Sequence, residues 1–303
     1  MEPWFTIINP SAAGGRCERN TAAALRRLKA QGLPLEIIRT RHSGHATALA
    51  MQGYDAGRRN FLSVGGDGTH FEVLNGIFPP KSVDGSVMGM LPGGTGNSFL
   101  RDFGITHLDD AVEAMIRHHS GSAPRAVDVV RVTHRDGQLH YINLLSVGFP
   151  ASVGAMTNRR FKPLGTAGYV LSVLLSLTRL QHPSFKMCVD GDRTSDERPC
   201  TLLSFSNSRY TGGKMLLAPT ADATDGEVDI VRVGPVGAMK LLRNFPRLYL
   251  GKHTAMSEYE HTRAKTVRFD AWTQPVDCMV DGEVVKLLIE QLDVLPQALK
   301  VVA

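Results

Sequence analysis

The sequence predicts an α/β domain followed by a β-rich domain, and three observations support this fold class. Buried-strand patterns alternate with helical patterns as far as Pro124. Beyond it, short strand patterns are separated by turn pairs such as Asp136-Gly137. The 303 residues suffice for two domains with a core each. We expect domains at residues 1–124 and 125–303, with the last residues free to pack back on the first domain.

Strands and helices alternate in order through the first domain. Apolar strand patterns lie at residues 5–8, 35–38, 61–64 and 87–91. Helical patterns lie at residues 22–28, 45–51 and 70–78. Strands that alternate with helices form a parallel sheet with helices on both faces.

The second domain has the pattern of an antiparallel sandwich or barrel. Its expected strands lie at residues 127–133, 139–145, 185–189, 201–206, 228–233, 266–269, 276–280 and 284–289. Two helical stretches, at residues 165–180 and 237–250, interrupt the strands.

Composition limits the class of protein and the compartment. A hydrophobic content of 43% with 21% charged residues is typical of a globular protein, and the net charge of +5 agrees with phosphate or anionic lipid partners without requiring them. The 4 cysteines form no CxxC pair, which argues against zinc and agrees with a reducing cytoplasm. The longest apolar run, at residues 169–177, is too short to span a bilayer, so a membrane substrate would be reached peripherally, from the inner face.

Four expected strands of the first domain end in loops rich in Gly, Ser, Thr or Asn. The loops lie at residues 9–16, 40–46, 65–69 and 92–97. Ligands of open parallel sheets bind at the carboxyl ends of the strands, where glycine backbones and helix N-termini favour phosphate. Asp67 would repel a bare polyphosphate, so its presence predicts an intervening Mg²⁺. The alternative interpretation is a set of ordinary tight turns.

Two common nucleotide motifs are absent. The sequence has neither GxxxxGK[ST] nor GxGxxG, which argues against a P-loop and against a dinucleotide site. The segments VGGDGT at residues 64–69, EVLNG at 72–76 and LPGGTGN at 91–97 instead resemble the diacylglycerol kinase catalytic-domain family, which includes sphingosine and ceramide kinases. The resemblance covers nearly the whole chain, although GGDG alone also occurs in NAD kinases and phosphofructokinases.

This resemblance implies an NAD-kinase-like nucleotide domain and a β-rich lipid domain, with ATP and Mg²⁺ as cofactors. The residues it implies for ATP contact are Asn9, Pro10, Ser11, Ala12, Ala13, Thr40, Gly65, Gly66, Asp67, Gly68, Thr69, His70, Phe71, Gly94, Thr95 and Asn97. Many diacylglycerol kinases have Asp after this Asn, whereas here Ser98 follows Asn97. The departure leaves the acceptor lipid open.

The resemblance also assigns roles to acidic residues in the second domain. It implies that Glu283 takes the proton from the lipid hydroxyl, with Asp281 as a supporting or metal-linked carboxylate and Asp67 completing the catalytic set. The alternative for Asp281-Gly282 is a plain hairpin turn. A structural Mg²⁺ is implied at Asp222, Asp225 and Glu227, for which a solvated turn is the alternative.

The leading hypothesis is an ATP-dependent lipid kinase acting on a diacylglycerol-like or a sphingoid or ceramide-like hydroxyl. The alternatives are a soluble NAD-kinase-like small-molecule kinase and a sensor that binds ATP without turnover. Residues 239–251 form a basic amphipathic segment, which suits either an anionic membrane or packing on the sheet. No nucleic-acid motif is present, and a homodimer stays open.

Overall fold

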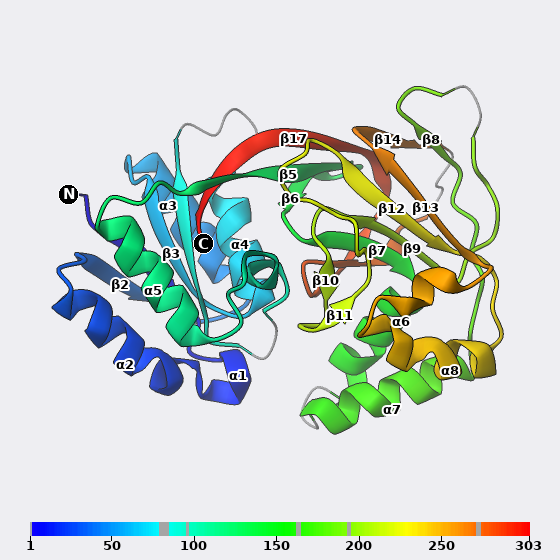
Figure 1. Cartoon of the computed structure of the whole chain (residues 1–303), viewed down its shortest axis with the longest axis horizontal. Coiled ribbons are helices and arrows are strands. Elements are labelled where there is room, and N and C mark those ends of the chain that lie inside the picture. The colour runs from blue at the N-terminus through cyan, green and yellow to red at the C-terminus, as the bar shows by residue number, and fades with distance from the viewer. Residues whose placement is uncertain (1, 79–84, 95–96, 162–164, 193–194, 271–273) are drawn as a thin grey trace. The chain divides into compact units, whose positions relative to one another are not determined.

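The computed structural model describes residues 2–78, 85–94, 97–161, 165–192, 195–270 and 274–303 (Figure 1). The chain divides into two units. The first comprises Met1–Val129, His140–Ile142 and Leu295–Ala303, and the second comprises Val130–Leu139 and Asn143–Val294.

The first unit contains a parallel sheet with strand order β2-β1-β3-β4, followed by the end of β17. The strands are β1 (Trp4–Ile8), β2 (Leu35–Arg39), β3 (Asn60–Gly65), β4 (Val87–Pro92) and β17 (Ile289–Val302). All five residues of β1 are buried, which explains why its sequence, WFTII, is apolar except for Thr6 rather than alternating. At the edge, Lys300–Val302 of β17 pair in parallel with residues 87–89 of β4.

Helices cover both faces of this sheet, as Figure 1 shows. They are α1 (Ala12–Gly15), α2 (Cys17–Ala30), α3 (His45–Asp55), α4 (Asp67–Ile77), η1 (Phe99–Phe103) and α5 (Leu108–His119). Helices α3 and α4 approach closely at Gly76, where a Cβ atom would lie 2.4 Å from the carbonyl oxygen of Thr47. The α/β prediction is confirmed, but α5 was not predicted, although Asp110 forms a capping box with His107 at its start.

The second unit contains a six-stranded antiparallel sheet with the order β13-β12-β9-β7-β15-β16. A second layer is formed by β17, β14 and β8, with β5 and β6 paired beside β17. The strands are β5 (Arg125–His134), β6 (Gly137–Tyr141), β7 (Leu144–Gly148), β8 (Met187–Val189), β9 (Leu202–Ser206), β10 (Tyr210–Thr211), β11 (Met215–Leu216), β12 (Val228–Val233), β13 (Tyr259–Ala264), β14 (Thr266–Phe269), β15 (Val276–Val280) and β16 (Glu283–Leu287). The rings of Phe205 in β9 and Phe269 in β14 meet edge to face at 5.5 Å between centroids, so the layers share a core. The predicted sandwich is confirmed.

The second unit differs from the prediction in several strands, since β10, β11 and all but the first residue of β17 were not predicted. The single strand expected at residues 139–145 is two strands, since β6 ends at Tyr141 and β7 begins at Leu144. Strand β13 was not predicted because its sequence, YEHTRA, is mostly polar, yet it pairs along its whole length with β12.

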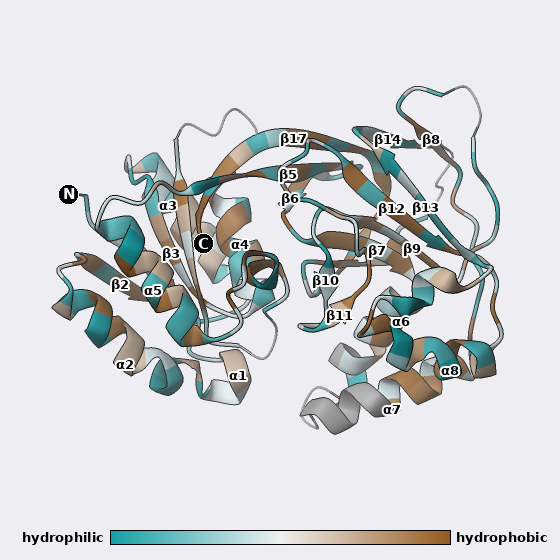
Figure 2. Cartoon of the chain, viewed as in Figure 1, coloured by the Kyte–Doolittle hydropathy of each residue, from teal (hydrophilic) through white to brown (hydrophobic). Residues whose placement is uncertain are grey.

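The helices of this unit are α6 (Phe149–Met156), η2 (Thr157–Phe161), α7 (Gly165–Leu177), α8 (Ala238–Leu248) and η4 (Lys252–Ala255). The hydropathy colouring in Figure 2 shows many apolar residues in the strands and both polar and apolar residues along α8. Within the described ranges, no helix is both long and apolar enough to cross a membrane.

Candidate functional site

Three of the four predicted loops meet at the carboxyl ends of β1, β3 and β4. The backbone N–H of Asn9 donates to the carbonyl oxygen of Val64 at 3.0 Å. The N–H groups of Gly93 and Gly94 both donate to the carbonyl oxygen of Gly65, at 2.7 and 3.0 Å. These contacts place the three loops at one edge of the sheet, as predicted for the carboxyl ends of parallel strands.

Glycine is required inside the third loop and where that loop touches the fourth. A Cβ atom on Gly94 would lie 2.5 Å from the Cα of Gly66, and one on Gly65 would lie 2.3 Å from Oγ1 of Thr69. Both distances are far below van der Waals contact. The glycines therefore let two backbones approach to a separation that no other residue permits, which is how a loop brings N–H groups near a phosphate.

Asp67 is the carboxylate of this loop cluster. It opens α4, and its two oxygens accept hydrogen bonds from the backbone N–H and from Oγ of Ser98, both at 3.2 Å. Burial raises the pKa of Asp67 to about 6, because loss of water disfavours the charged form, and the bonds from Ser98 oppose this rise. A nearby divalent cation would relieve the cost of the charge.

His70 occupies the interior rather than the loop surface. Its ring is 5% exposed, and its Nδ1 lies 2.8 Å from Oγ of Ser63 in β3. Burial lowers the pKa of His70 to about 4, so the ring is neutral at physiological pH. Any ATP contact by this residue would involve its backbone, and the predicted contact stays a prediction.

The first loop is held by Asn9. Its Oδ1 accepts the backbone N–H of Ser11 at 3.0 Å, and its Nδ2 donates to Oγ1 of Thr69 in α4 at 3.0 Å. Ala13 adopts a left-handed conformation with φ of 52°. Such a conformation costs a non-glycine residue about 1–2 kcal/mol and is often found at functional loops.

The second loop is held by the side chain of Glu72, which was not among the predicted site residues. Glu72 of α4 accepts the N–H groups of Gly44 and Ala46, at 2.8 and 3.1 Å, and so satisfies the N-terminus of α3. Thr40 donates its N–H to Ile8 and continues the pairing of β2 with β1. Of this loop, Thr40 remains the predicted nucleotide contact.

The remaining predicted residues of the first unit lie in or beside these loops. Gly68 and Phe71 belong to α4, Pro10 and Ala12 to the first loop, and Asn97 precedes Ser98. Asn97 donates through Nδ2 to the carbonyl oxygen of Ile105 at 3.3 Å. Thr95 lies outside the described residues.

In the second unit, Asp281 and Gly282 form a two-residue turn between β15 and β16. Their φ angles are 45° and 86°, and Val280 pairs with Glu283 across the turn. Asp281 is 3% exposed, and its Oδ1 accepts the N–H groups of Asn143 and Leu144 at 3.0 Å each. Its own N–H donates to the carbonyl oxygen of Leu144 at 3.0 Å. The hairpin is confirmed, and Asp281 anchors it to the start of β7.

Glu283, the predicted base, is exposed at the start of β16. Because the turn before it is fixed by three hydrogen bonds, the backbone that carries Glu283 has a defined position within the unit. Its catalytic role stays a prediction.

The predicted metal ligands lie in the loop before β12. Asp222 accepts the N–H and Oγ1 of Thr224, at 3.0 and 2.7 Å. Asp225 and Glu227 form ion pairs with Arg263 of β13, whose Nε is also 3.7 Å from Oδ2 of buried Asp229.

These carboxylates do not form a metal centre as they stand. Among the residues that the structure describes, no group of three or more His, Cys, Asp or Glu is placed to hold an ion. Arg263 already supplies the positive charge that the loop requires. Magnesium at Asp222, Asp225 and Glu227 therefore stays a prediction.

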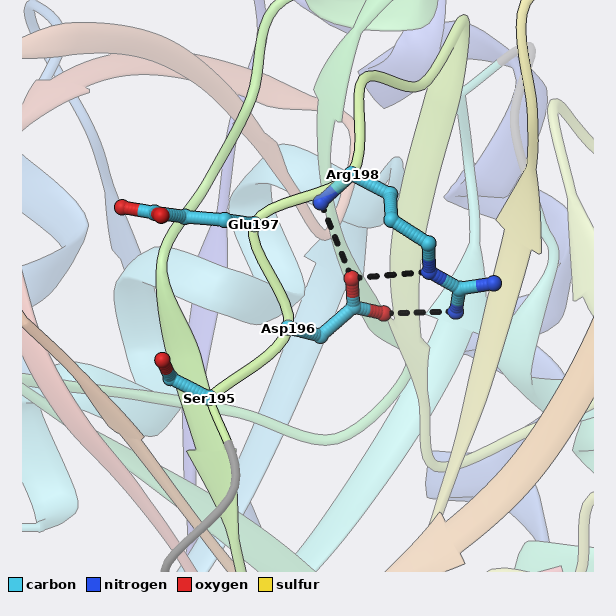
Figure 3. Close-up of a pocket in the computed structure, with 4 residues that line it drawn as sticks. All are labelled: Ser195, Asp196, Glu197 and Arg198. Carbon is cyan, nitrogen blue, oxygen red and sulfur yellow. Dashed lines mark hydrogen bonds and ion pairs between the residues drawn. The ribbon is translucent and has the colours of Figure 1, made fainter.

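An open pocket of the second unit is lined by Ser195, Asp196, Glu197 and Arg198 (Figure 3). Arg198 forms paired bonds with Asp196, at 3.0 Å from Nε and 2.8 Å from Nη2, and a second pair with Glu260. The charges of Asp196 and Arg198 are thus used within the protein. None of its residues belongs to the predicted site.

Two family models match the chain in succession. The model described as the diacylglycerol kinase catalytic domain matches residues 3–132, and the YegS C-terminal NAD kinase beta sandwich-like domain matches residues 143–303. The description of the second model likens residues 143–303 to the β-sandwich of NAD kinase, which agrees with the antiparallel sheet observed there. With both models matched in succession, the chain belongs to the diacylglycerol kinase family. The resemblance seen in the sequence is confirmed.

Individual proteins are similar over almost the full length. A diacylglycerol kinase of Mycobacterium tuberculosis (strain H37Rv) is 29% identical over 299 residues, which are 97% of this chain and 93% of the relative. The "Probable lipid kinase YegS-like" of Stenotrophomonas maltophilia is 26% identical over 297 residues, with the same two coverages of 97% and 93%. The crystal structure of a diacylglycerol kinase from Bacillus anthracis (strain Sterne) is 22% identical, covers 99% of this chain and 96% of its own, and has a TM-score of 0.71, which shows the fold.

Proposed function

We propose that the protein is an ATP-dependent lipid kinase that transfers the γ-phosphoryl group of ATP to a hydroxyl group of a membrane lipid. The observation that carries the proposal is the cluster of glycine loops around Asp67. Two backbones meet there at a distance that excludes a Cβ atom, and a carboxylate is held beside them by Ser98. Family membership makes a phosphotransferase the matching class of enzyme.

The residues of this loop cluster fit a magnesium-bound triphosphate. When bound, Mg²⁺ would supply the positive charge that neutralises the phosphate oxygens, with Asp67 as the residue that faces it. The loops at residues 9–13 and 65–71, together with Gly94 and Asn97, would surround the phosphates. Ser98 keeps the Asp67 carboxylate in one orientation through its two hydrogen bonds.

For the transfer itself, we propose that Glu283 accepts the proton of the lipid hydroxyl. As the hydroxyl oxygen forms its bond to the γ-phosphorus, the bond to the β-γ bridging oxygen breaks and ADP leaves. A carboxylate in this position contributes roughly 10²–10⁴-fold to such reactions. Asp281, in contrast, has its Oδ1 committed to two backbone N–H groups, which suits a positioning role.

The acceptor that we favour is diacylglycerol or a similar lipid, because relatives that match almost the full length carry the name diacylglycerol kinase or lipid kinase. A sphingoid base or ceramide has the same primary hydroxyl chemistry. We further propose that the enzyme works in the cytoplasm at the inner face of the membrane, and that it reaches the lipid from the surface. All four cysteines are free, as a reducing compartment requires.

A transfer assay tests this proposal. Labelled ATP with Mg²⁺ is offered in parallel with mixed micelles of diacylglycerol, monoacylglycerol, ceramide or sphingosine, and with NAD. We expect a labelled phospholipid from one of the lipids. Labelled NADP without a labelled lipid would establish the small-molecule kinase, and ATP binding without any product would establish a sensor.

The variant Glu283→Gln separates chemistry from binding. It preserves the size of the side chain and removes its ability to take a proton, so we expect kcat to fall by at least about 10²-fold. The affinity for Mg·ATP, measured by calorimetry, is expected to be unchanged. Glu290→Gln, a second exposed glutamate later in the same unit, is the matched control. Turnover near the parent value in Glu283→Gln would remove this residue from the mechanism.

A further inference from the structure

Helix α8 in the second unit has apolar residues on two faces. The inward face packs Leu248 against a buried cluster that includes Leu217 and Ala221, and Asn244 is buried on the same side. The outward face carries Met239 and Leu242, which are 77% and 43% exposed. A helix that only covers a sheet needs apolar residues on the inward side alone.

The exposed apolar stripe continues beyond the helix. Tyr249 and Leu250 are 49% and 67% exposed, and they follow Leu242 by two helical turns. Four large apolar side chains are thus turned to solvent within twelve residues. Single exposed apolar residues are ordinary on protein surfaces, but a contiguous row marks an interaction surface.

The charge of this segment is of one sign. Residues 234–257 contain no Asp or Glu, whereas Lys240, Arg243, Arg247 and Lys252 lie among or just after the exposed apolar residues. Lys240 is paired with Glu258 from the segment that leads into β13. Within the described part of the chain, Arg243, Arg247 and Lys252 have no carboxylate partner, and all three are exposed. Their charges are available to an external anion.

We propose that the outward surface of residues 239–252 docks on an anionic phospholipid bilayer. Met239, Leu242 and Leu250 enter the boundary between head groups and acyl chains, while Arg243, Arg247 and Lys252 contact lipid phosphates. This inference rests on the proposed lipid kinase function, since it names the surface by which such an enzyme reaches its substrate.

Helix α7 shows why charge decides the occupant. It exposes Leu171, Leu174 and Leu175, at 39%, 47% and 37%, but Gly165–Leu177 contains no charged residue. Nothing in that helix selects a lipid surface over another apolar partner. On α8, apolar residues are combined with Arg243 and Arg247, for which the described residues provide no carboxylate partner, and this combination matches a negatively charged interface.

Vesicle binding tests the proposal without any kinase reaction. The full chain is sedimented with vesicles of phosphatidylcholine alone or with 30% phosphatidylglycerol, about a third of the lipid as in anionic membranes. Each basic residue near such a surface adds about 1 kcal/mol, or about five-fold in partitioning. We expect Arg243→Ser/Arg247→Ser to weaken partitioning about 25-fold, and Leu242→Ser/Leu250→Ser to weaken it by at least about ten-fold. Leu174→Ser on α7 is the matched control and is expected to bind like the parent.

Each outcome bears on one of the two proposals. Phosphorylation of a short-chain diacylglycerol dispersed in detergent is expected to be equal in the parent and in all variants. Absence of that activity in the parent would contradict the proposed kinase function and leave the docking surface unaffected. Equal vesicle binding by parent and α8 variants would overturn the docking surface. So would sedimentation equilibrium in which Leu242→Ser/Leu250→Ser converts a dimer to a monomer while vesicle binding is kept, since the stripe would then be a contact between copies.

Discussion

Replacement of Asp281 distinguishes a positioning carboxylate from a catalytic one. The residue lies in the turn before the proposed base, with Oδ1 at 3.0 Å from the backbone nitrogens of both Asn143 and Leu144. Two substitutions separate the loss of the hydrogen-bond acceptor from the loss of the carboxylate charge. Asp281→Asn keeps an oxygen acceptor in the same place, whereas Asp281→Ala removes it.

The expected losses of stability follow from these contacts. Alanine leaves two buried N–H groups without this acceptor, at about 1–3 kcal/mol each. It also places an alanine at φ of 45°, a conformation that asparagine and aspartate tolerate better. We therefore expect Asp281→Ala to lower the free energy of unfolding by about 4 kcal/mol and Asp281→Asn by about 1 kcal/mol.

The free energy of unfolding is measured by urea unfolding followed by tryptophan fluorescence and circular dichroism. The turnover number kcat is measured by steady-state kinetics with Mg·ATP and dispersed lipid. If Asp281 positions the hairpin, Asp281→Asn retains most of kcat. The reasoning is refuted if Asp281→Asn stays as stable as the parent and loses turnover as fully as Glu283→Gln. In that case the Asp281 carboxylate charge takes part in the chemistry.

Three further predictions concern side chains around the loops. The folded pKa of Asp67, about 6, lies above the unfolded value of 3.8, so the folded state loses stability as pH rises from about 4 to 6. Asp67→Asn should therefore abolish Mg·ATP turnover. It should also raise the free energy of unfolding at pH 7.5 by at most about 3 kcal/mol, but leave it unchanged at pH 4. An equal gain in stability at pH 7.5 and pH 4 would contradict the assignment of the gain to the buried charge of Asp67. Ser98→Ala removes one of two bonds to Asp67 and should raise KM for Mg·ATP about five-fold, with Ser98→Thr as the rescuing control; an unchanged KM in Ser98→Ala would show that the hydroxyl does not position Asp67. Arg263→Ala should lower stability by about 1–2 kcal/mol, whereas EDTA should leave the melting temperature of the parent unchanged, and a fall in that temperature with EDTA would favour a bound metal over Arg263.

The fold was predictable where burial leaves a local mark. Strands β1, β3 and β4 are mostly apolar runs ended by glycine or Asn-Pro, as expected for strands buried on both faces. Strand β13 was missed because its sequence, YEHTRA, is mostly polar, and it lies at the edge of a sheet, where solvent permits polar side chains.

The candidate site was predictable only in its local part. The glycine loops can be recognised in the sequence, since close backbone approach needs glycine at the point of contact. The partners of these loops come from far along the chain: Ser98 is 31 residues from Asp67, and Glu72 is 28 residues from Gly44. Arg263 reaches the acidic loop through the pairing of β12 with β13. No periodicity in the sequence encodes such pairings.

The return of β17 to the first unit has a consequence for biosynthesis. Residues 300–302 supply the hydrogen bonds on one side of β4, and they leave the ribosome some two hundred residues after β4 itself, by their positions in the sequence. During that interval the nascent first unit carries an unpaired strand edge, which is a template for association with other chains. Proteolytic trimming of these few residues would recreate the same open edge in the mature protein.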